Sequence, residues 1–480
     1  MPHKSSMIFI VSTSKDGPDP ITRRVIRSHA MLGRNTRADR RRRAWERGNN
    51  TATSTDLPSS DSPSSSSRLD LGRSSEVDTS SFEETYMDER HGSALSIQGK
   101  IAPELSLARY DFEMKPYMIR LLQQALTTSK PCTYAVDLKL VQESEAQLFT
   151  LTDIITHKAA IHSILYTAQA FEELCLQVPI SNLTRFHLGM TLYHLQQTLN
   201  EVHNATAMAV IAVIVNLASA ASFVGDVEAT VKHLEGLSQI FKMRGGITRV
   251  EAATMTELKA LRIDICMSMV TGRSPRLLNE QTFQGLQAAT SCLFKADPRN
   301  IDMLPPIDSK LAVLWLELKY YSIVANEAAA TKTAVPTDLF LLVSISVPYR
   351  LLQLKYETQS ISELLRLCML AFIKSILFTV PGRGKIMSYL YTELDSHLRL
   401  HLQACLQPNT SVEHSFVVIW ALFIASISIF EDFSQDWYDG AIVFVLSKLH
   451  VTDWHHCRKI LGMFLWIPQI YDKAAETVFK

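Results

Sequence analysis

The chain has 480 residues, of which 47% are hydrophobic and 20% are charged, and its 48 basic residues balance its 48 acidic residues. That length and apolar content suffice for a large buried core in one or two domains. The seven cysteines are scattered singly, without zinc-finger or redox spacing, which argues against a zinc finger and indicates reduced core thiols in an intracellular protein.

The neutral total hides a basic N-terminal element, residues 1–48. Residues 1–50 hold 12 Lys or Arg against 4 Asp or Glu, a net charge of +8, so the rest of the chain carries −8. Ten arginines lie between Arg23 and Arg47. Such a cluster is typical of a nuclear import signal or of contact with nucleic acid phosphates, with a solvated tail as the alternative. The predicted contact residues are Arg37, Arg40, Arg41, Arg42, Arg43 and Arg47.

Residues 49–100 predict a disordered linker. The stretch from Ser59 to Ser67 reads SSDSPSSSS, and Ser, Asp, Glu and Gly remain frequent up to Lys100. A segment of this composition buries too little apolar surface to offset the entropy that it would lose on ordering.

Residues 101–480 predict one all-α domain. Helical patterns follow one another without a convincing alternating strand, and the most strand-like run, Leu341–Pro348, is short and ends in proline. Glycines and prolines such as Gly440 are taken as joints between helices, which are expected at Leu311–Ala325, Leu364–Phe378 and Thr452–Trp466. We expect stacked antiparallel helix hairpins, arranged as a solenoid or a bundle, and find no fixed-period repeat.

A helix hairpin, Met208–Gly246, is expected at the centre of this domain. Met208–Val224 is apolar on nearly every face and predicts a fully buried helix. Like Phe416–Phe430, this run is shorter than the roughly 20 residues of a membrane span, so both are predicted as core helices. Asp226 is expected to cap a second, amphipathic helix, on which Lys232, His233, Glu235 and Lys242 lie mostly off the apolar stripe. Gly245 and Gly246 end that helix.

The sequence predicts no catalytic residue, no metal ligand and no cofactor. The adjacent residues His455, His456 and Cys457 point to different sides of a helix and cannot share one ion. The Arg244-Gly245-Gly246 end of the second helix fits a helix cap better than a ligand pocket. Asp264 is expected either to pair with Arg273 or Arg276 between helices or to form a solvated pair.

Several short motifs resemble those of the fungal-specific transcription factor domain family. His233–Ile247 (HLEGLSQIFKMRGGI) is similar to a helix of that family with a histidine-led start and an Arg-Gly-Gly end, and Leu261–Leu277 is similar to its Asp-containing helix with a following Gly-x-x-Pro turn. Phe9 with Ile26–Met31 resembles an N-terminal element of such proteins, and Phe464–Ile467 with Asp472 resembles a C-terminal tail. The residues that the resemblance marks as structural are His233, Arg244, Gly245, Gly246, Asp264 and Pro275.

The chain departs from the full family pattern at its N-terminus. Full members carry a six-cysteine zinc cluster that places a helix in the DNA major groove, whereas the first 131 residues here contain no cysteine. The resemblance therefore implies a nuclear, transcription-linked regulatory protein without its own zinc-cluster module, acting through a helical interaction or ligand-sensing domain and not as an enzyme. Expected partners are transcription machinery or an import receptor, with weak non-specific nucleic acid contact; no membrane contact and no particular oligomeric state are predicted. The alternatives are a helical enzyme with an unrecognised pocket and a membrane-associated helical scaffold.

Overall fold

The computed structural model describes residues 114–127, 157–199, 208–247, 253–278, 303–377, 387–407, 409–430 and 436–480. The chain divides into two units, Met1–Lys100 and Ile101–Lys480, and every described residue belongs to the second. The predicted basic element and linker, including all six candidate arginines, therefore lie outside the described residues.

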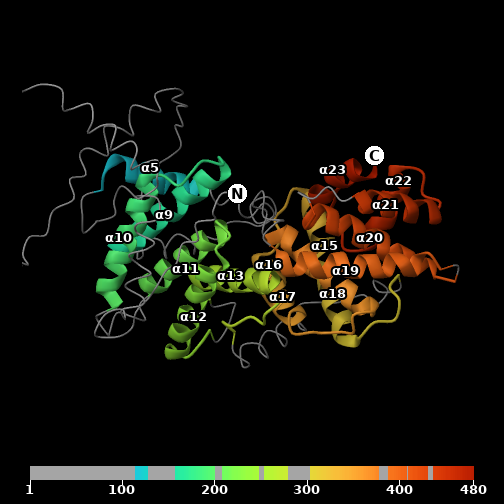
Figure 1. The fold of residues 1–480 in the computed structure, drawn as a ribbon, viewed down its shortest axis with the longest axis horizontal. Coiled ribbons are helices and arrows are strands. Elements are labelled where there is room, and N and C mark those ends of the chain that lie inside the picture. The colour runs from blue at the N-terminus through green and yellow to red at the C-terminus, as the bar shows by residue number, and fades with distance from the viewer. Residues whose placement is uncertain are drawn as a thin grey trace, which may run out of the picture. The chain divides into compact units, whose positions relative to one another are not determined.

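The regular structure of the described residues is helical and includes no strand, which confirms the all-α prediction (Figure 1). The helices are α5 (Pro116–Thr127), α9 (Lys158–Cys175), α10 (Asn182–Leu199), α11 (Met208–Phe223), α12 (Val227–Met243), α13 (Met255–Thr271), α15 (Ser309–Thr331), α16 (Thr337–Leu341), the π-helical turn η2 (Leu342–Ser346), α17 (Val347–Leu351), α18 (Ile361–Leu377), α19 (Ser388–Cys405), α20 (Val412–Ser428), α21 (Asp436–Lys448), α22 (Trp454–Met463) and α23 (Pro468–Phe479).

The hairpin predicted at the centre is formed by α11 and α12. Helix α11 carries no charged residue, and its buried positions, from Val210 to Ser222, lie on all sides because it packs against α9, α12 and α13. Gly225, with φ +77°, turns the chain, and the carboxylate of Asp226 accepts a hydrogen bond from the Ala229 amide at 3.0 Å, which caps α12 as expected.

Helix α20 is the second strongly apolar helix, and its residues from Val417 to Ala425 are all buried. It packs against α18, α19, α21 and α23, as apolar residues on every face require. Within the described ranges, no helix is both long enough and apolar enough to cross a membrane.

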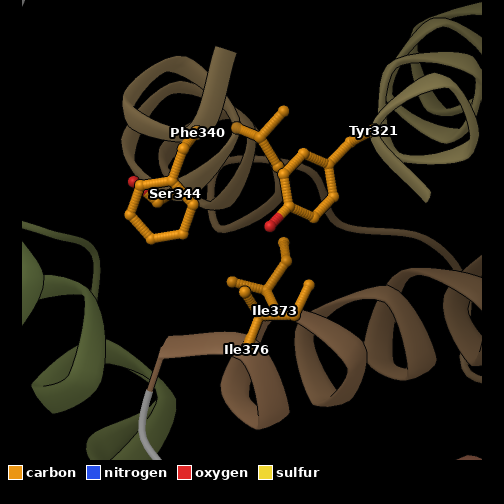
Figure 2. Close-up of a pocket in the computed structure, with 6 residues that line it drawn as sticks. Tyr321, Phe340, Ser344, Ile373 and Ile376 are labelled. Atoms are coloured by element: carbon orange, nitrogen blue, oxygen red, sulfur yellow. The ribbon is translucent and has the colours of Figure 1, made fainter. Parts of the chain in front are cut away.

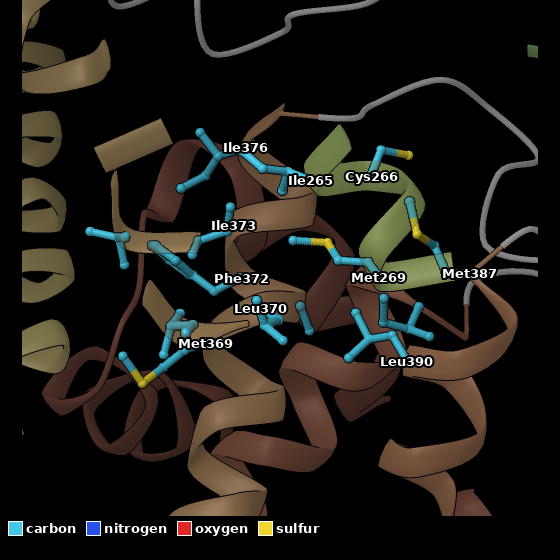
Figure 3. Close-up of a cluster of buried hydrophobic side chains, with 14 of the residues drawn as sticks. Ile265, Cys266, Met269, Met369, Leu370, Phe372, Ile373, Ile376, Met387 and Leu390 are labelled. Atoms are coloured by element: carbon cyan, nitrogen blue, oxygen red, sulfur yellow. The ribbon is translucent and has the colours of Figure 1, made fainter. Parts of the chain in front are cut away.

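One hydrophobic core joins the helices before residue 278 to those after residue 308. Ile265 and Met269 of α13 belong to one cluster of buried side chains with Leu370 and Ile373 of α18 and with Leu390 of α19 (Figure 3). Residues of α13 are therefore buried by helices that follow them by more than 90 positions in the sequence.

The strand-like run Leu341–Pro348 is helical and contains the π-helical turn η2. Proline has no amide hydrogen and its ring clashes with the carbonyl four residues earlier, so Pro348 cannot continue a regular helix across Ser344. Widening the preceding turn to the π form accommodates the ring, and the β-branched residues Val343 and Ile345 remain buried.

Three expected boundaries are wrong. Gly440 lies inside α21 and not at a joint, and the helix expected to end at Ala325 runs to Thr331. The helix expected to run to Trp466 ends at Met463. The ammonium of Lys319, on α15, donates hydrogen bonds to the carbonyls of Gly462, Met463 and Phe464 at 3.1, 2.8 and 2.5 Å. A cation from a distant helix thus satisfies the carbonyls at the end of α22, and the chain turns there.

The C-terminal residues that carry the tail resemblance hold this turn in place. The indole of Trp420 donates to the Leu465 carbonyl at 3.2 Å, and the indole of Trp466 donates to the Asp472 carboxylate at 2.8 Å. Asp472 also accepts from Arg458 at 2.7 Å. Phe464–Ile467 and Asp472 therefore have a structural role between α22 and α23.

Candidate functional site at the α12–α13 connection

The C-terminal end of α12 is closed by its two glycines. Gly245 and Gly246 have φ values of +88° and +83°, which glycine adopts without the strain of a Cβ atom. The Gly246 amide donates to the Phe241 carbonyl at 2.7 Å, and the Gly245 amide donates to that of Lys242 at 3.2 Å. This pattern satisfies carbonyls that the last turn would otherwise leave without partners.

The Arg244 side chain connects this end of α12 to two neighbouring helices. Its guanidinium lies 2.7 Å from the Met208 sulfur at the start of α11 and 3.8 Å from the carboxylate of Glu257 in α13. Glu257 also forms a capping box with Thr254 at the start of α13. Arg244 thus contacts helix ends rather than a cavity.

His233 is buried on α12, contrary to the expectation that it faces away from the apolar stripe. Its side chain retains 5% of its exposure, and burial lowers its pKa to about 4. The imidazole is therefore neutral at pH 7, because a neutral ring costs far less to bury than a charged one.

Asp264 forms the polar centre of the α13 region. One carboxylate oxygen accepts hydrogen bonds from the backbone amides of Arg276 and Leu277, at 2.8 and 2.9 Å, and from the hydroxyl of Tyr349 at 2.7 Å. The side chain is 2% exposed. Burial raises the pKa of Asp264, and the three hydrogen bonds and the nearby Arg276 oppose that rise. The carboxylate holds the segment after α13 and the helix α17 together.

This arrangement differs from the expected ion pair between Asp264 and Arg273 or Arg276. The guanidinium of Arg276 lies 3.7 Å from Glu235 on α12, and the contacts of Asp264 with the following segment are to backbone amides. Arg273 is exposed. Which backbone amides come close to a buried carboxylate depends on the packing of the chain and not on residue type. The sequence pattern, which shows side chains only, therefore suggested the wrong partner.

The Gly-x-x-Pro turn after α13 lies against α19. Gly272 has φ +70°, and a Cβ atom placed there would lie 2.6 Å from the ring of Tyr389. The neighbouring Ser388 hydroxyl donates to the Val270 carbonyl at 3.0 Å. Pro275 is half-buried in the same turn. Both the conformation and the close ring favour glycine at this position.

A polar groove lies between the outer face of α12 and the turn that follows α13. Its volume is about 390 Å³, and it is lined by Glu235, Ser238, Gln239, Lys242 and Arg276. The Ser238 hydroxyl donates to the Arg276 carbonyl at 3.3 Å, which joins the two sides. The groove is open to solvent and all its lining residues are polar.

A second gap, inside the C-terminal helices, is apolar and closed. Tyr321, Phe340, Ser344, Ile373 and Ile376 converge on it from α15, α16, η2 and α18 (Figure 2). Their side chains fill it so closely that no room remains for a water molecule. It therefore offers no space to a ligand in this conformation.

Histidines gather at two further places. His162 and His187 lie 2.9 Å apart between α9 and α10, and burial lowers their pKa values to about 4 and about 3. His401 and His414 have ring centroids 5.2 Å apart between α19 and α20. Over the described residues, no group of three or more His, Cys, Asp or Glu side chains is arranged to hold a metal ion.

Comparison with known protein families identifies the segment that contains this site. Residues 110–307 match the family model described as the fungal specific transcription factor domain. Over these residues the chain is similar to that family. No curated protein and no solved structure matched the chain.

The fungal transcription factor domain accounts for the location of the motif residues. His233, Arg244, Gly245, Gly246, Asp264 and Pro275 all lie within residues 110–307. The match links the chain to transcription regulation, and the family is one of transcription factor domains rather than of enzymes. Tyr349 and Tyr389, which contact Asp264 and Gly272, lie beyond the matched residues.

The sequence did not point to the groove or to Tyr349. Glu235, Ser238 and Lys242 lie three or four positions apart, which places them on one helix face, but such a face is ordinarily solvated. The groove exists because Arg276, more than 30 positions away, lies across that face. No local sequence pattern predicts that a residue so distant in the sequence lies across a helix face.

Proposed function

We propose that this chain is a transcription-factor-like regulatory protein of fungal type. It acts through a helical interaction or ligand-sensing domain and without a zinc-cluster module of its own. The observation that carries the proposal is the match of residues 110–307 to the fungal specific transcription factor domain. Its support comes from the motif residues of that segment, which are engaged in caps and buried contacts, as in a regulatory scaffold.

The proposed organisation has three parts. The basic element, residues 1–48, supplies nuclear import through Arg37, Arg40–Arg43 and Arg47, or loose contact with nucleic acid phosphates. Residues 49–100 serve as a linker, and residues 101–480 form the regulatory domain, which engages protein partners of the transcription machinery. The protein is proposed to work in the nucleus and not as an enzyme. Among the described residues, no feature favours the enzymatic or membrane-scaffold interpretation over this one.

A tethering experiment tests the regulatory function. The full chain is fused to a heterologous DNA-binding domain and recruited to a reporter promoter in a fungal host. We expect reporter transcription to rise or fall relative to the DNA-binding domain alone. An Asp264→Ala variant, which breaks the buried contacts of the domain, should lose the effect, whereas Lys232→Gln on the exposed face of α12 should keep it. An unchanged reporter, at equal nuclear protein levels, would refute the proposal.

A further inference from the structure

The polar groove beside α12 holds one arginine whose backbone is fixed on both sides. The Arg276 amide donates to the buried Asp264 carboxylate at 2.8 Å, and the Arg276 carbonyl accepts from the Ser238 hydroxyl at 3.3 Å. Arg276 lines the groove, its guanidinium lies 3.7 Å from the carboxylate of Glu235, another lining residue, and its side chain is 27% exposed. The position from which this side chain extends is therefore set by the fold, while its charged end is available to the groove.

Two more hydrogen-bond donors line the same groove. Lys242 and Gln239 project from α12, and in the part of the chain that the structure describes neither side chain makes an ion pair or hydrogen bond with another described residue. Glu235 is the one acidic residue of the lining; it lies 3.7 Å from Arg276 and is 54% exposed. Two cations face one carboxylate, so the groove carries a net positive charge. An exposed ion pair at this distance is weak, and an incoming anion can replace Glu235 beside the guanidinium.

We propose that this groove binds a small polar oxyanion, a carboxylate or a phosphate. A guanidinium fork matches the geometry of either group, and a lysine adds a point charge. Gln239 and Ser238 supply hydrogen-bonding groups for the uncharged part of the ligand. The groove has a volume of about 390 Å³, which gives room for a small anion. The polar lining selects against lipophilic ligands, which the closed apolar gap in the C-terminal helices also cannot admit.

The groove also has a physical connection to the domain core. The backbone of Arg276 is bound to Asp264, which in turn accepts a hydrogen bond from Tyr349 on α17. A ligand that binds the Arg276 side chain therefore acts on the segment directly after α13, which Asp264 holds against α17. The binding site stands on the groove alone, whereas its use as an effector site rests on the proposed function.

Calorimetric titration of the full chain with citrate and with inorganic phosphate tests the site and separates the two anion classes. Glycerol, which is polar but uncharged, is the ligand control. Arg276→Gln and Lys242→Gln should each weaken the preferred anion by about tenfold or more, because each removes a charged hydrogen-bond donor. Glu235→Gln should strengthen binding, because it removes the competing carboxylate. Lys232→Gln, a charge loss on the same helix but outside the groove, should leave binding unchanged.

The proposal would be overturned by binding that persists in the Arg276→Gln/Lys242→Gln double variant, by equal heats with glycerol, or by no binding of either anion. Loss of binding in an Arg40–Arg43→Ala variant would assign the anion to the basic element instead. Circular dichroism melting of each variant confirms that it is folded. If the anion binds as expected and the tethered chain leaves the reporter unchanged, the site stands and the proposed function fails. If the reporter responds and no anion binds, the proposed function stands and the anion site fails.

Discussion

Replacing Asp264 with alanine tests the central contact of the candidate site. In the folded chain this carboxylate serves three donors at once: the amides of Arg276 and Leu277 and the hydroxyl of Tyr349. Asp264 is 2% exposed, Tyr349 and Leu277 are buried, and Arg276 is half-buried. The substitution leaves these donors without their acceptor in a place that solvent reaches poorly.

The expected loss of stability follows from that geometry. A buried donor left without a partner costs about 1–3 kcal/mol, so three give about 3–9 kcal/mol. Removing the carboxylate also removes the free-energy cost of burying its charge. The same burial raises the pKa of Asp264. With this relief, the net loss should be on the order of 3–5 kcal/mol. Tyr349→Phe removes one of the three contacts and should cost about 1.5–3 kcal/mol.

Urea denaturation at pH 7, followed by circular dichroism, measures these differences. Asp264→Asn keeps an acceptor oxygen without the charge and should lose less stability than Asp264→Ala. Glu228→Ala is the matched control, because it deletes a carboxylate that is 70% exposed on α12 and should change stability by less than about 0.5 kcal/mol. If Asp264→Ala were as mild as Glu228→Ala, the carboxylate would not hold the segment after α13, and the argument would be wrong.

Three other consequences can be measured on the same protein. Gly246→Val should cost about 1–3 kcal/mol, because Gly246 has φ +83°, whereas Gly236→Ala in the middle of α12 should be neutral or stabilising by up to about 1 kcal/mol. The pKa of His233 in the fold is about 4, below its ordinary 6.5, so the unfolded chain binds the proton first. Stability present above pH 6.5 should therefore be lost as the pH falls toward 4, by roughly 3 kcal/mol for this residue, and His233→Gln should flatten the slope in urea titrations at pH 7 and 5. Arg40–Arg43→Ala should leave the melting temperature unchanged but move a fluorescently tagged protein out of the nucleus; if the segment instead contacts nucleic acid, the salt dependence of binding should become shallower by about three to four log units per log unit.

The helices themselves could largely be predicted from the sequence, because periodicity and capping residues are local signals. The uncharged run that became α11 and the Asp226 cap of α12 both follow from residues within one or two helical turns. The glycine pair that ends α12 follows from the same kind of signal. Helix boundaries that depend on distant residues could not be predicted in this way. The end of α22 at Met463 depends on Lys319, which lies on another helix more than 140 positions earlier.

The burial of His233 was missed for a different reason. A histidine among Lys232 and Glu235 suggests a solvated face when only neighbouring residues are considered. His233 precedes the fully buried Leu234, and the close packing of α11 and α13 around α12 widens the buried surface beyond the apolar stripe. The width of a buried face depends on how many helices pack on it, and that number is a property of the whole fold.

Asp264 shows how the local and the distant signals combine. Asp264 lies twelve positions before Arg276, and this spacing suggested an ion pair between the two side chains. In the structure the Asp264 carboxylate instead accepts hydrogen bonds from the backbone amides of Arg276 and Leu277. A buried carboxylate needs hydrogen-bond donors more than it needs a counter-charge, and two adjacent amides at a turn supply them without the entropy cost of fixing a long side chain. This choice of partner leaves the Arg276 guanidinium outside the buried contact and on the wall of the groove. Asp264 therefore fixes the turn after α13 from the core side, and it thereby positions the Arg276 side chain at the surface groove.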